Sequence, residues 1–183
     1  SDALRDHAKR IKEHTLAHLD QYLEQLEASV QKLGGHVHWA ATAEDARQII
    51  VKIAQQAGCK NAVKSKSMTS EEIHLNAALQ KAGIEVTETD YGEFIIQIAG
   101  ERPSHLVAPA VHHTRESIAA LLSEHLHEHL PDDPKSLALA GRRVLREKFY
   151  RADLGITGVN FAVAETGTIV LITNEGNGRL TTT

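Results

Sequence analysis

The sequence predicts an α/β fold in which a mostly parallel sheet is covered by helices on both faces. Short segments rich in apolar and β-branched residues alternate with helical segments of about 10–15 residues, which is the order typical of parallel sheets. The chain has 183 residues, 42% of them hydrophobic and 24% charged, so it can bury one sizeable core. Alternating residues near the end, from 159 to 173, predict a smaller antiparallel portion.

Composition and charge exclude several classes of protein. Twenty Lys and Arg against 24 Asp and Glu give a formal charge of −4 with no basic block, which argues against a nucleic-acid reader. The longest wholly apolar runs, such as 169–172, are far too short for a membrane span or a signal peptide. Cys59 is the only cysteine, so a disulfide within this segment is excluded, and we expect a cytoplasmic location.

The first part of the chain predicts one long helix. From Leu4 to Leu33 apolar residues recur every three or four positions without Pro or Gly, the period of an amphipathic helix. Gly34 and Gly35 follow and suit its end. We therefore divide the chain into a long N-terminal helix over 1–34 and an α/β domain over 35–183.

The α/β domain is predicted from its capping residues, turns and apolar segments. Asp90 and Glu93 are spaced to begin a short helix, although a buried strand is the alternative there. The last strand runs into Gly-rich sequence with no closing helix, so we expect a piece of a longer polypeptide, truncated at its C-terminal end. The predicted elements are a strand at 36–40, a helix at 42–57 with Thr42 and Asp45 as its capping box, a strand at 61–67, a helix at 70–82 with Thr69 and Glu72 as its box, a strand at 84–88, a helix at 90–98, a strand at 105–108, a helix from 114 to 130, a helix at 134–150 and strands at 159–163 and 168–173.

A first candidate site lies where a predicted strand ends and a helix begins, at 64–69. Lys64 and Lys66 share one face of the strand there, and ligands of parallel sheets bind at such strand ends. The unpaired N–H groups of the helix start add positive charge. This pattern predicts a small-anion site with Ser65, Lys66 and Ser67 as ligand-binding residues. The alternative is that the lysines are solvated and that Ser67 or Thr69 only caps the helix.

A second candidate site lies at the end of the next predicted strand. Glu88, Asp90 and Glu93 place three carboxylates within six residues. Paired carboxylates act as acid and base when burial or mutual repulsion raises one pKa. Glu93 is therefore a candidate catalytic residue and Asp90 a candidate ligand-binding residue, with helix capping as the alternative for both.

A third candidate site is formed by two short segments near the end of the chain. Glu165 lies between two apolar strands, where backbone N–H groups favour nucleophilic or base chemistry. Hairpin turns also have this pattern, because Gly and Asn accept positive φ angles. The candidate catalytic residue is Glu165, and the candidate ligand-binding residues are Thr166, Gly167, Asn174, Glu175 and Asn177.

Twelve histidines are many for this length and require separate interpretation. The pairs His14/His18 and His125/His129 are each four residues apart, but no H-E-x-x-H pattern and no nearby third ligand accompany them. We therefore expect no metal site. His112 follows a predicted strand end and is a candidate proton carrier if it faces Lys66 and Glu93, with core packing or helix entry as the alternatives.

Several motifs together resemble the LUD domain of lactate utilization proteins, in particular of the iron–sulfur subunits of bacterial L-lactate oxidising systems. They occur in consistent order over nearly the whole chain. The motifs are Lys64-Ser65-Lys66-Ser67-Met68, Glu88-Thr89-Asp90, Gly92-Glu93-Phe94-Ile95-Ile96-Gln97, Pro103-Ser104-His105, Pro109-Ala110, Ala164-Glu165-Thr166-Gly167-Thr168 and Asn174-Glu175-Gly176-Asn177-Gly178-Arg179.

The resemblance implies a three-layer α/β fold similar to the sugar-phosphate isomerase and CoA-transferase superfamily. It also implies a full-length protein with two [4Fe–4S] clusters in a ferredoxin-like region and two partner subunits. The cysteines of those clusters are absent from this segment. Related CoA-transferases use a Glu in a Glu-x-Gly context, an outline that Glu165-Thr166-Gly167 shares.

Three functions follow as hypotheses. The first is the LUD domain of an iron–sulfur subunit for L-lactate utilisation, with a crevice for a small anion or a partner. The second is an enzyme that binds an acyl-CoA or a phosphorylated metabolite and uses Glu165. The third is a docking domain for assembly without catalysis.

Overall fold

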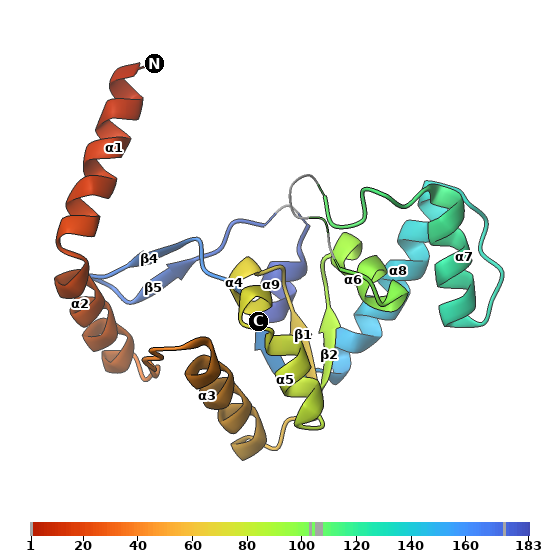
Figure 1. Ribbon diagram of the computed structural model, residues 1–183, viewed down its shortest axis with the longest axis horizontal. Helices are drawn as coiled ribbons and strands as arrows, with labels where there is room; N and C mark the ends of the chain where they lie inside the picture. The colour runs from red at the N-terminus through yellow and green to blue at the C-terminus, as the bar shows by residue number, and fades with distance from the viewer. Residues whose placement is uncertain (1, 103, 105–107, 174) are drawn as a thin grey trace. The chain divides into compact units, whose positions relative to one another are not determined.

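The computed structural model describes residues 2–102, 104, 108–173 and 175–183. The chain forms two compact units, one made of the residues up to Trp39 with Val159–Ile172, the other of Ala40–Gly158 with Thr173–Thr183 (Figure 1). Within the described ranges, no helix is long and apolar enough to cross a membrane.

The first unit begins with two helices, α1 (Asp2–Ala17) and α2 (Leu19–Lys32). The prediction of one continuous helix is wrong at His18, whose backbone leaves the helical region with φ −126° and ψ 29°. The His18 ring lies against the preceding turn, with Nδ1 at 2.9 Å from the carbonyl oxygen of His14. The predicted strand at 36–40 is also wrong, because these residues form no strand.

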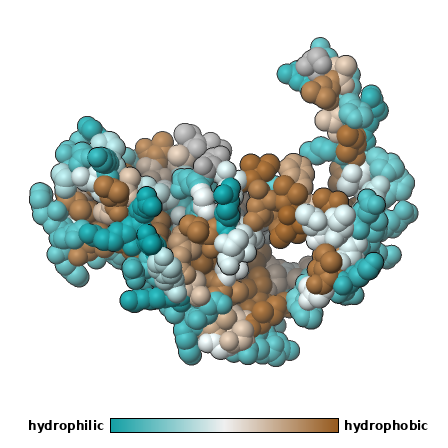
Figure 2. Space-filling view, turned by 180° about the vertical axis from the view of Figure 1, so that it is seen from behind, coloured by the Kyte–Doolittle hydropathy of each residue, from teal (hydrophilic) through white to brown (hydrophobic). Residues whose placement is uncertain are grey.

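The first unit also contains an antiparallel hairpin of β4 (Phe161–Val163) and β5 (Thr168–Val170), which confirms the antiparallel portion. Its turn packs on α2, where Ser29 Oγ donates to the carbonyl oxygen of Ala164 at 2.7 Å. Gly167 has φ +71°, and a Cβ there would lie 2.9 Å from the backbone of Ser29. Apolar side chains of the hairpin, such as Phe161 and Ile169, are exposed, and Figure 2 shows hydrophobic residues reaching the surface.

The second unit contains a three-stranded parallel sheet, as the alternation of strands and helices predicted. Its strands are β1 (Asn61–Lys64), β2 (Glu85–Glu88) and β3 (Leu154–Ile156), in the order β2-β1-β3. Lys64 at the end of β1 pairs with Glu88 on one side and Ile156 on the other. All three strands therefore end together, and the side chains that follow them meet at one edge of the sheet.

Helices α3 (Ala43–Gln56) and α5 (Leu75–Lys81) pack on the sheet. The predicted capping box of α3 is confirmed, with Thr42 and Asp45 bonded reciprocally. The helix predicted over 70–82 is divided, because His74 adopts a left-handed conformation with φ 52° between α4 (Met68–Glu72) and α5. The first core cluster consists of Ala54, Cys59, Ala62, Leu75, Leu79, Ile84 and Val86.

Four further helices complete the second unit: α6 (Tyr91–Ala99), α7 (Arg115–Leu126), α8 (Pro134–Arg151) and α9 (Asn177–Thr182). Asp90 and Thr114 cap α6 and α7 as predicted. Three residues of the strand predicted at 105–108 lie outside the described residues. The expectation that no helix follows the last strands is wrong, because α9 does. The second core cluster joins α6, α7 and α8 through Phe94, Ile95, Ala119, Leu122, Leu137 and Leu145.

Asp153 connects the beginning of β3 to the beginning of β1. Its Oδ2 accepts the backbone N–H groups of Lys60 and Asn61, both at 2.9 Å. These two hydrogen bonds hold the pKa of the Asp153 carboxyl below its ordinary value of 3.8. The carboxylate therefore stabilises the fold above that pH, and its contribution is lost as the pH falls through the lower pKa of the folded state.

We expect Asp153→Asn to lower the melting temperature at neutral pH and to matter less in acid. The amide keeps an acceptor oxygen but loses the charge that strengthens both hydrogen bonds. Thermal unfolding from about pH 7 down to about pH 3 measures this, since the difference from the unsubstituted chain shrinks as the carboxylate protonates. A difference that is constant over the whole range would contradict the explanation.

Candidate functional site

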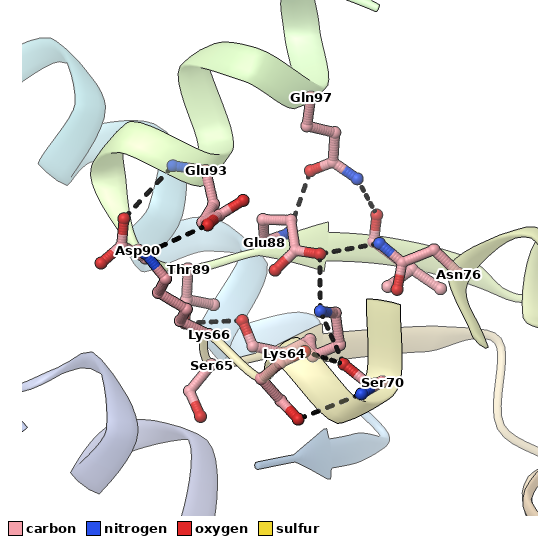
Figure 3. A network of polar contacts seen from close by, with 12 residues as sticks. Lys64, Ser65, Lys66, Ser70, Asn76, Glu88, Thr89, Asp90, Glu93 and Gln97 are labelled. Carbon is pink, nitrogen blue, oxygen red and sulfur yellow. Dashed lines mark hydrogen bonds and ion pairs between the residues drawn. The ribbon is translucent and has the colours of Figure 1, made fainter. Parts of the chain in front are cut away.

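The ends of β1 and β2 carry a buried polar network (Figure 3). Lys64 is completely buried, and its Nζ lies 2.8 Å from Oε1 of Glu88 and 3.1 Å from Oγ of Ser70. Asn76 donates from Nδ2 to the same Glu88 oxygen at 2.7 Å. The alternative that both lysines are solvated is therefore wrong for Lys64. Its ammonium is compensated within the fold and does not serve an anionic ligand.

The side chain of Gln97 forms hydrogen bonds with the backbone of β2 along its unpaired edge. Its Oε1 accepts the backbone N–H of Glu88 at 2.9 Å, and its Nε2 donates to the carbonyl oxygen of Val86 at 2.7 Å. Because β2 is an edge strand, the carboxamide satisfies backbone groups that a further strand would otherwise pair. Two buried acceptors, Oε2 of Glu88 and Oδ1 of Asn76, have no hydrogen-bond partner in the described part of the chain.

An open cavity of about 570 Å³ lies beside this network, within the range of small-molecule sites. We call it the acidic cavity, because its lining includes Glu71, Glu88, Glu93 and Glu101. Asn76 also lines it, so both residues with unsatisfied acceptors border the same space. Glu88 and Glu93 are already paired with lysines and Arg102 also lines the cavity, so it is the two unpartnered acceptors that favour a ligand, one that donates hydrogen bonds.

The residues after Lys64 and Glu88 form a second group, which we call the strand-end group: Ser65, Lys66, Ser67, Asp90 and Glu93. Lys66 is partly exposed, and its Nζ lies 3.5 Å from Oε1 of Glu93. Asp90 accepts the backbone N–H of Glu93 at 3.2 Å, so capping is confirmed for Asp90. Ser67 caps α4, which confirms the capping alternative for Ser67, whereas the capping box predicted from Thr69 does not start the helix. Ser65 donates from Oγ to Oγ1 of Thr157 at 2.6 Å. The structure therefore brings the first two candidate sites together at one edge of the sheet.

A second open cavity, of about 650 Å³, lies between α8 and the segment that leads into α9. We call it the arginine cavity, because Arg142 and Arg146 line it from successive turns of α8. Arg146 donates to the hydroxyl of Tyr150 at 3.0 Å and lies over its ring. Arg142 has no ion-pair partner among the residues that the structure describes. Guanidinium groups with free donors are suited to carboxylate and phosphate ligands.

Two predicted site residues, Glu175 and Asn177, also line the arginine cavity, together with Thr89. Nδ2 of Asn177 donates to Oγ1 of Thr89 at 3.3 Å. Partial burial of the Glu175 carboxyl, and then the charge of Asp90, raise the pKa of Glu175 above its ordinary value. The charged form of the Glu175 carboxyl is therefore less favourable than in water, in the cavity that the two arginines also line.

The remaining predicted site residues lie elsewhere or are not described. Glu165, Thr166 and Gly167 belong to the hairpin turn of the first unit, which is the turn alternative for this motif. His112 hydrogen-bonds Glu101, with Nε2 at 2.6 Å from Oε2. Asn174 lies outside the described residues. Catalytic roles for Glu165, His112 and Glu93 remain predictions.

Sequence reasoning missed the residues that give the two cavities their charge. Arg142 and Arg146 are four residues apart on a strongly predicted helix, a spacing that places both side chains on one face. The spacing of the two arginines was visible in the sequence, but the same spacing is common on solvated helix surfaces and does not by itself indicate a cavity. Glu101 carries no local signal, because its neighbours His112 and His113 follow only after a long connection.

The parallel sheet, whose strands end together beside polar residues and two cavities, defines an α/β domain with candidate ligand sites. The chain belongs to the LUD domain family, whose model matches residues 23–183. This confirms the resemblance read from the motifs.

The chain is similar to several curated bacterial proteins over nearly its whole length. It is 50% identical over 179 residues, 98% of the chain, to the protein named "Uncharacterized electron transport protein YkgF" of Escherichia coli K12. It is 51% and 50% identical over 177 residues, 96% of the chain, to the proteins named "Lactate utilization protein B" of Bacillus velezensis and Bacillus subtilis. The chain spans only 37–38% of the length of these relatives. No solved structure matches it.

Proposed function

We propose that this chain is the LUD region of a bacterial protein for the oxidation of L-lactate to pyruvate. The observation that carries the proposal is its identity of about one half, over 96% of the chain, with proteins named for lactate utilisation. Oxidation of lactate releases two electrons and two protons, so an electron carrier must accept the electrons. A further relative is named an electron transport protein, which supports a role in such a chain of carriers.

The electron carriers in this proposal are two [4Fe–4S] clusters outside these 183 residues, in a cytoplasmic complex with two other lactate-utilisation subunits. Four-iron clusters are held by cysteine thiolates, whereas this segment has one cysteine, Cys59, which is buried. The segment therefore contributes binding rather than electron transfer. For its architecture we propose the three-layer arrangement of the sugar-phosphate isomerase and CoA-transferase superfamily, which the parallel order β2-β1-β3 supports.

The ligand that we propose for the arginine cavity is a small carboxylate of the pathway, L-lactate or pyruvate. Arg142 offers a guanidinium that no ion pair with a described residue occupies, and planar carboxylates accept two parallel hydrogen bonds from such a group. Thr89 and Asn177 can orient a hydroxyl or carbonyl oxygen beside it.

The test is growth on L-lactate of a bacterial strain that lacks its own lactate-oxidising protein and carries the full-length gene. We expect the double variant Arg142→Gln/Arg146→Gln to abolish growth on L-lactate while growth on glucose continues. Arg143→Gln is the matched control, because Arg143 pairs with Glu128 and does not line the cavity. Normal growth of the double variant on L-lactate, at the rate of the Arg143→Gln control, would contradict a ligand role for the arginine cavity.

A docking role is the second candidate, and exposed apolar residues favour it. Phe161 and Ile169 of the hairpin are 62% and 51% exposed, and Leu4 of α1 is 68% exposed. Phe161 pairs across the hairpin with Val170, which is 38% exposed, so two apolar side chains are neighbours on one face, and exposed apolar patches are typical of protein interfaces. If docking is the whole function, Phe161→Ser/Ile169→Ser prevents copurification of the partner subunits, and the arginine variants grow normally.

A further inference from the structure

Three side chains with metal-binding atoms meet beside the end of α6. Glu101 follows α6, and His112 and His113 precede α7. Nε2 of His112 and Nε2 of His113 lie 2.6 Å and 3.2 Å from Oε2 of Glu101. One ligand atom from each residue lies within 4.8 Å of the others, and this is the only such group among the described residues. The two imidazole rings lie side by side, with centroids 4.5 Å apart.

We propose that Glu101, His112 and His113 bind a divalent transition-metal ion such as Zn²⁺ through two imidazole nitrogens and one carboxylate oxygen. Two histidines with one carboxylate suit zinc or ferrous iron, while a site of oxygen atoms alone suits magnesium or calcium. The proposal is independent of the lactate function and adds a ligand class for the acidic cavity, which Glu101 lines.

The hydrogen bonds around His113 favour a metal at its Nε2. Ser117 donates from Oγ to the carbonyl oxygen of Thr114 at 2.9 Å, so its lone pairs face Nδ1 of His113 at 3.1 Å. This arrangement suits the tautomer with its proton on Nδ1, which leaves the Nε2 lone pair available to a metal ion on the side of Glu101. Histidine ligands commonly donate their second ring N–H to an oxygen in this way.

The distances are close to those of a loaded site. With bonds of about 2.0–2.2 Å and tetrahedral angles, ligand atoms lie about 3.3–3.6 Å from one another. The separation of 3.2 Å between His113 and Glu101 already fits, and the 2.6 Å between His112 and Glu101 must lengthen by a fraction of an ångström. His112 and Glu101 are exposed side chains, with 46% and 43% accessible, and can make this adjustment.

Three protein ligands leave a fourth position for water or for a ligand of the acidic cavity. Sites that hold a zinc ion only for stability use four protein ligands, whereas three with an open position are typical of sites that bind or activate a small molecule. We therefore assign the ion to the rim of the acidic cavity, where an oxygen atom of a bound metabolite completes its coordination. This assignment departs from the expectation of no metal site, because the sequence pattern could not place Glu101 beside the two histidines.

The test is a competition titration of Zn²⁺ between the full-length protein and a chromophoric chelator, with bound zinc counted by mass spectrometry. We expect His112→Ala/His113→Ala to bind one zinc ion fewer per chain than the unsubstituted protein. Ser117→Ala should still bind this ion, with affinity lower by about 10–100-fold. Any cysteine sites elsewhere in the protein contribute equally to all variants and cancel in the comparison.

The matched control is His14→Ala/His18→Ala, which removes two neighbouring histidines from the first unit, whose rings are 4.4 Å apart. We expect this control to bind as much zinc as the unsubstituted protein. Equal zinc stoichiometry and affinity in the His112/His113 variant would overturn the proposal. If that variant does not fold, Glu101→Gln, which changes an exposed side chain, must weaken binding of the same ion, and unchanged binding there would also overturn it.

Discussion

Substitution of Lys64 by Met is expected to destabilise the chain by about 3–5 kcal/mol, the usual effect of breaking a buried ion pair. Lys64 is completely buried, and Glu88 is 5% exposed. Met fills a similar volume but leaves the Glu88 carboxylate without its cation in a site from which water is excluded. Oε2 of Glu88 already lacks a hydrogen-bond partner, and Oε1 would keep only the neutral amide of Asn76, which does not replace the charge of the ammonium.

Urea unfolding measures this effect, with Lys60→Met as the matched control. Lys60 lies four residues earlier and is exposed, so its substitution is expected to change stability by less than about 0.5 kcal/mol. The double variant Lys64→Met/Glu88→Leu removes both charges and is expected to be more stable than Lys64→Met alone. A loss below about 1 kcal/mol in the single variant would show that Glu88 is not left as an uncompensated buried charge.

The second large effect is expected at Gly155 in β3. A Cβ at this position would lie 1.8 Å from the carbonyl oxygen of Thr181 in α9 and 3.0 Å from its carbonyl carbon. Both atoms are backbone, so the clash cannot be relieved by rotating a side chain. We expect Gly155→Ala to destabilise the chain by about 3 kcal/mol or more, the upper end of overpacking effects, and to displace α9 with Asn177.

Gly176→Ala is the matched control for this prediction. Gly176 has φ −52°, and a Cβ added there would meet no atom within 4 Å, so alanine fits without strain. Thermal unfolding and growth on L-lactate are the two measurements. Gly155→Ala is expected to lower the melting temperature, and also to prevent growth on L-lactate because α9 carries part of the arginine cavity. Equal melting temperatures for the two variants would contradict the close packing of β3 against α9.

Local signals in the sequence predicted the elements that begin with a capping residue. Thr42, Asp90 and Thr114 each cap the helix predicted to follow them, because the hydrogen bonds involved join residues only a few positions apart. The break at His18 has no Pro or Gly to mark it. The left-handed residue His74 is likewise unmarked, because positive φ is uncommon for any residue other than Gly and a single histidine does not predict it.

Elements that depend on distant partners were missed. β3 has three residues, and its partner β1 lies about ninety positions earlier, so no local pattern identifies it. α9 has six residues with a Gly before and within it, a composition that argues against a helix until its packing against β3 is known.

The strand-end group was predicted in part, because parallel strands place their following residues at one edge. Lys66 and Glu93 do meet there. The two cavities were not predicted, since each combines residues from helices and loops that periodicity cannot bring together. Arg142 contributes from α8, and Glu101 from the end of α6.

The central claim is that this LUD domain serves a cluster-bearing protein that takes electrons from L-lactate. The most direct measurement is the visible absorption of the anaerobically purified full-length protein with its partner subunits, before and after addition of L-lactate, together with its iron content. We predict a brown protein with about eight irons per chain, as two four-iron clusters require, whose absorption bleaches when L-lactate is added. A colourless, iron-free protein, or clusters that L-lactate leaves oxidised, would contradict the account.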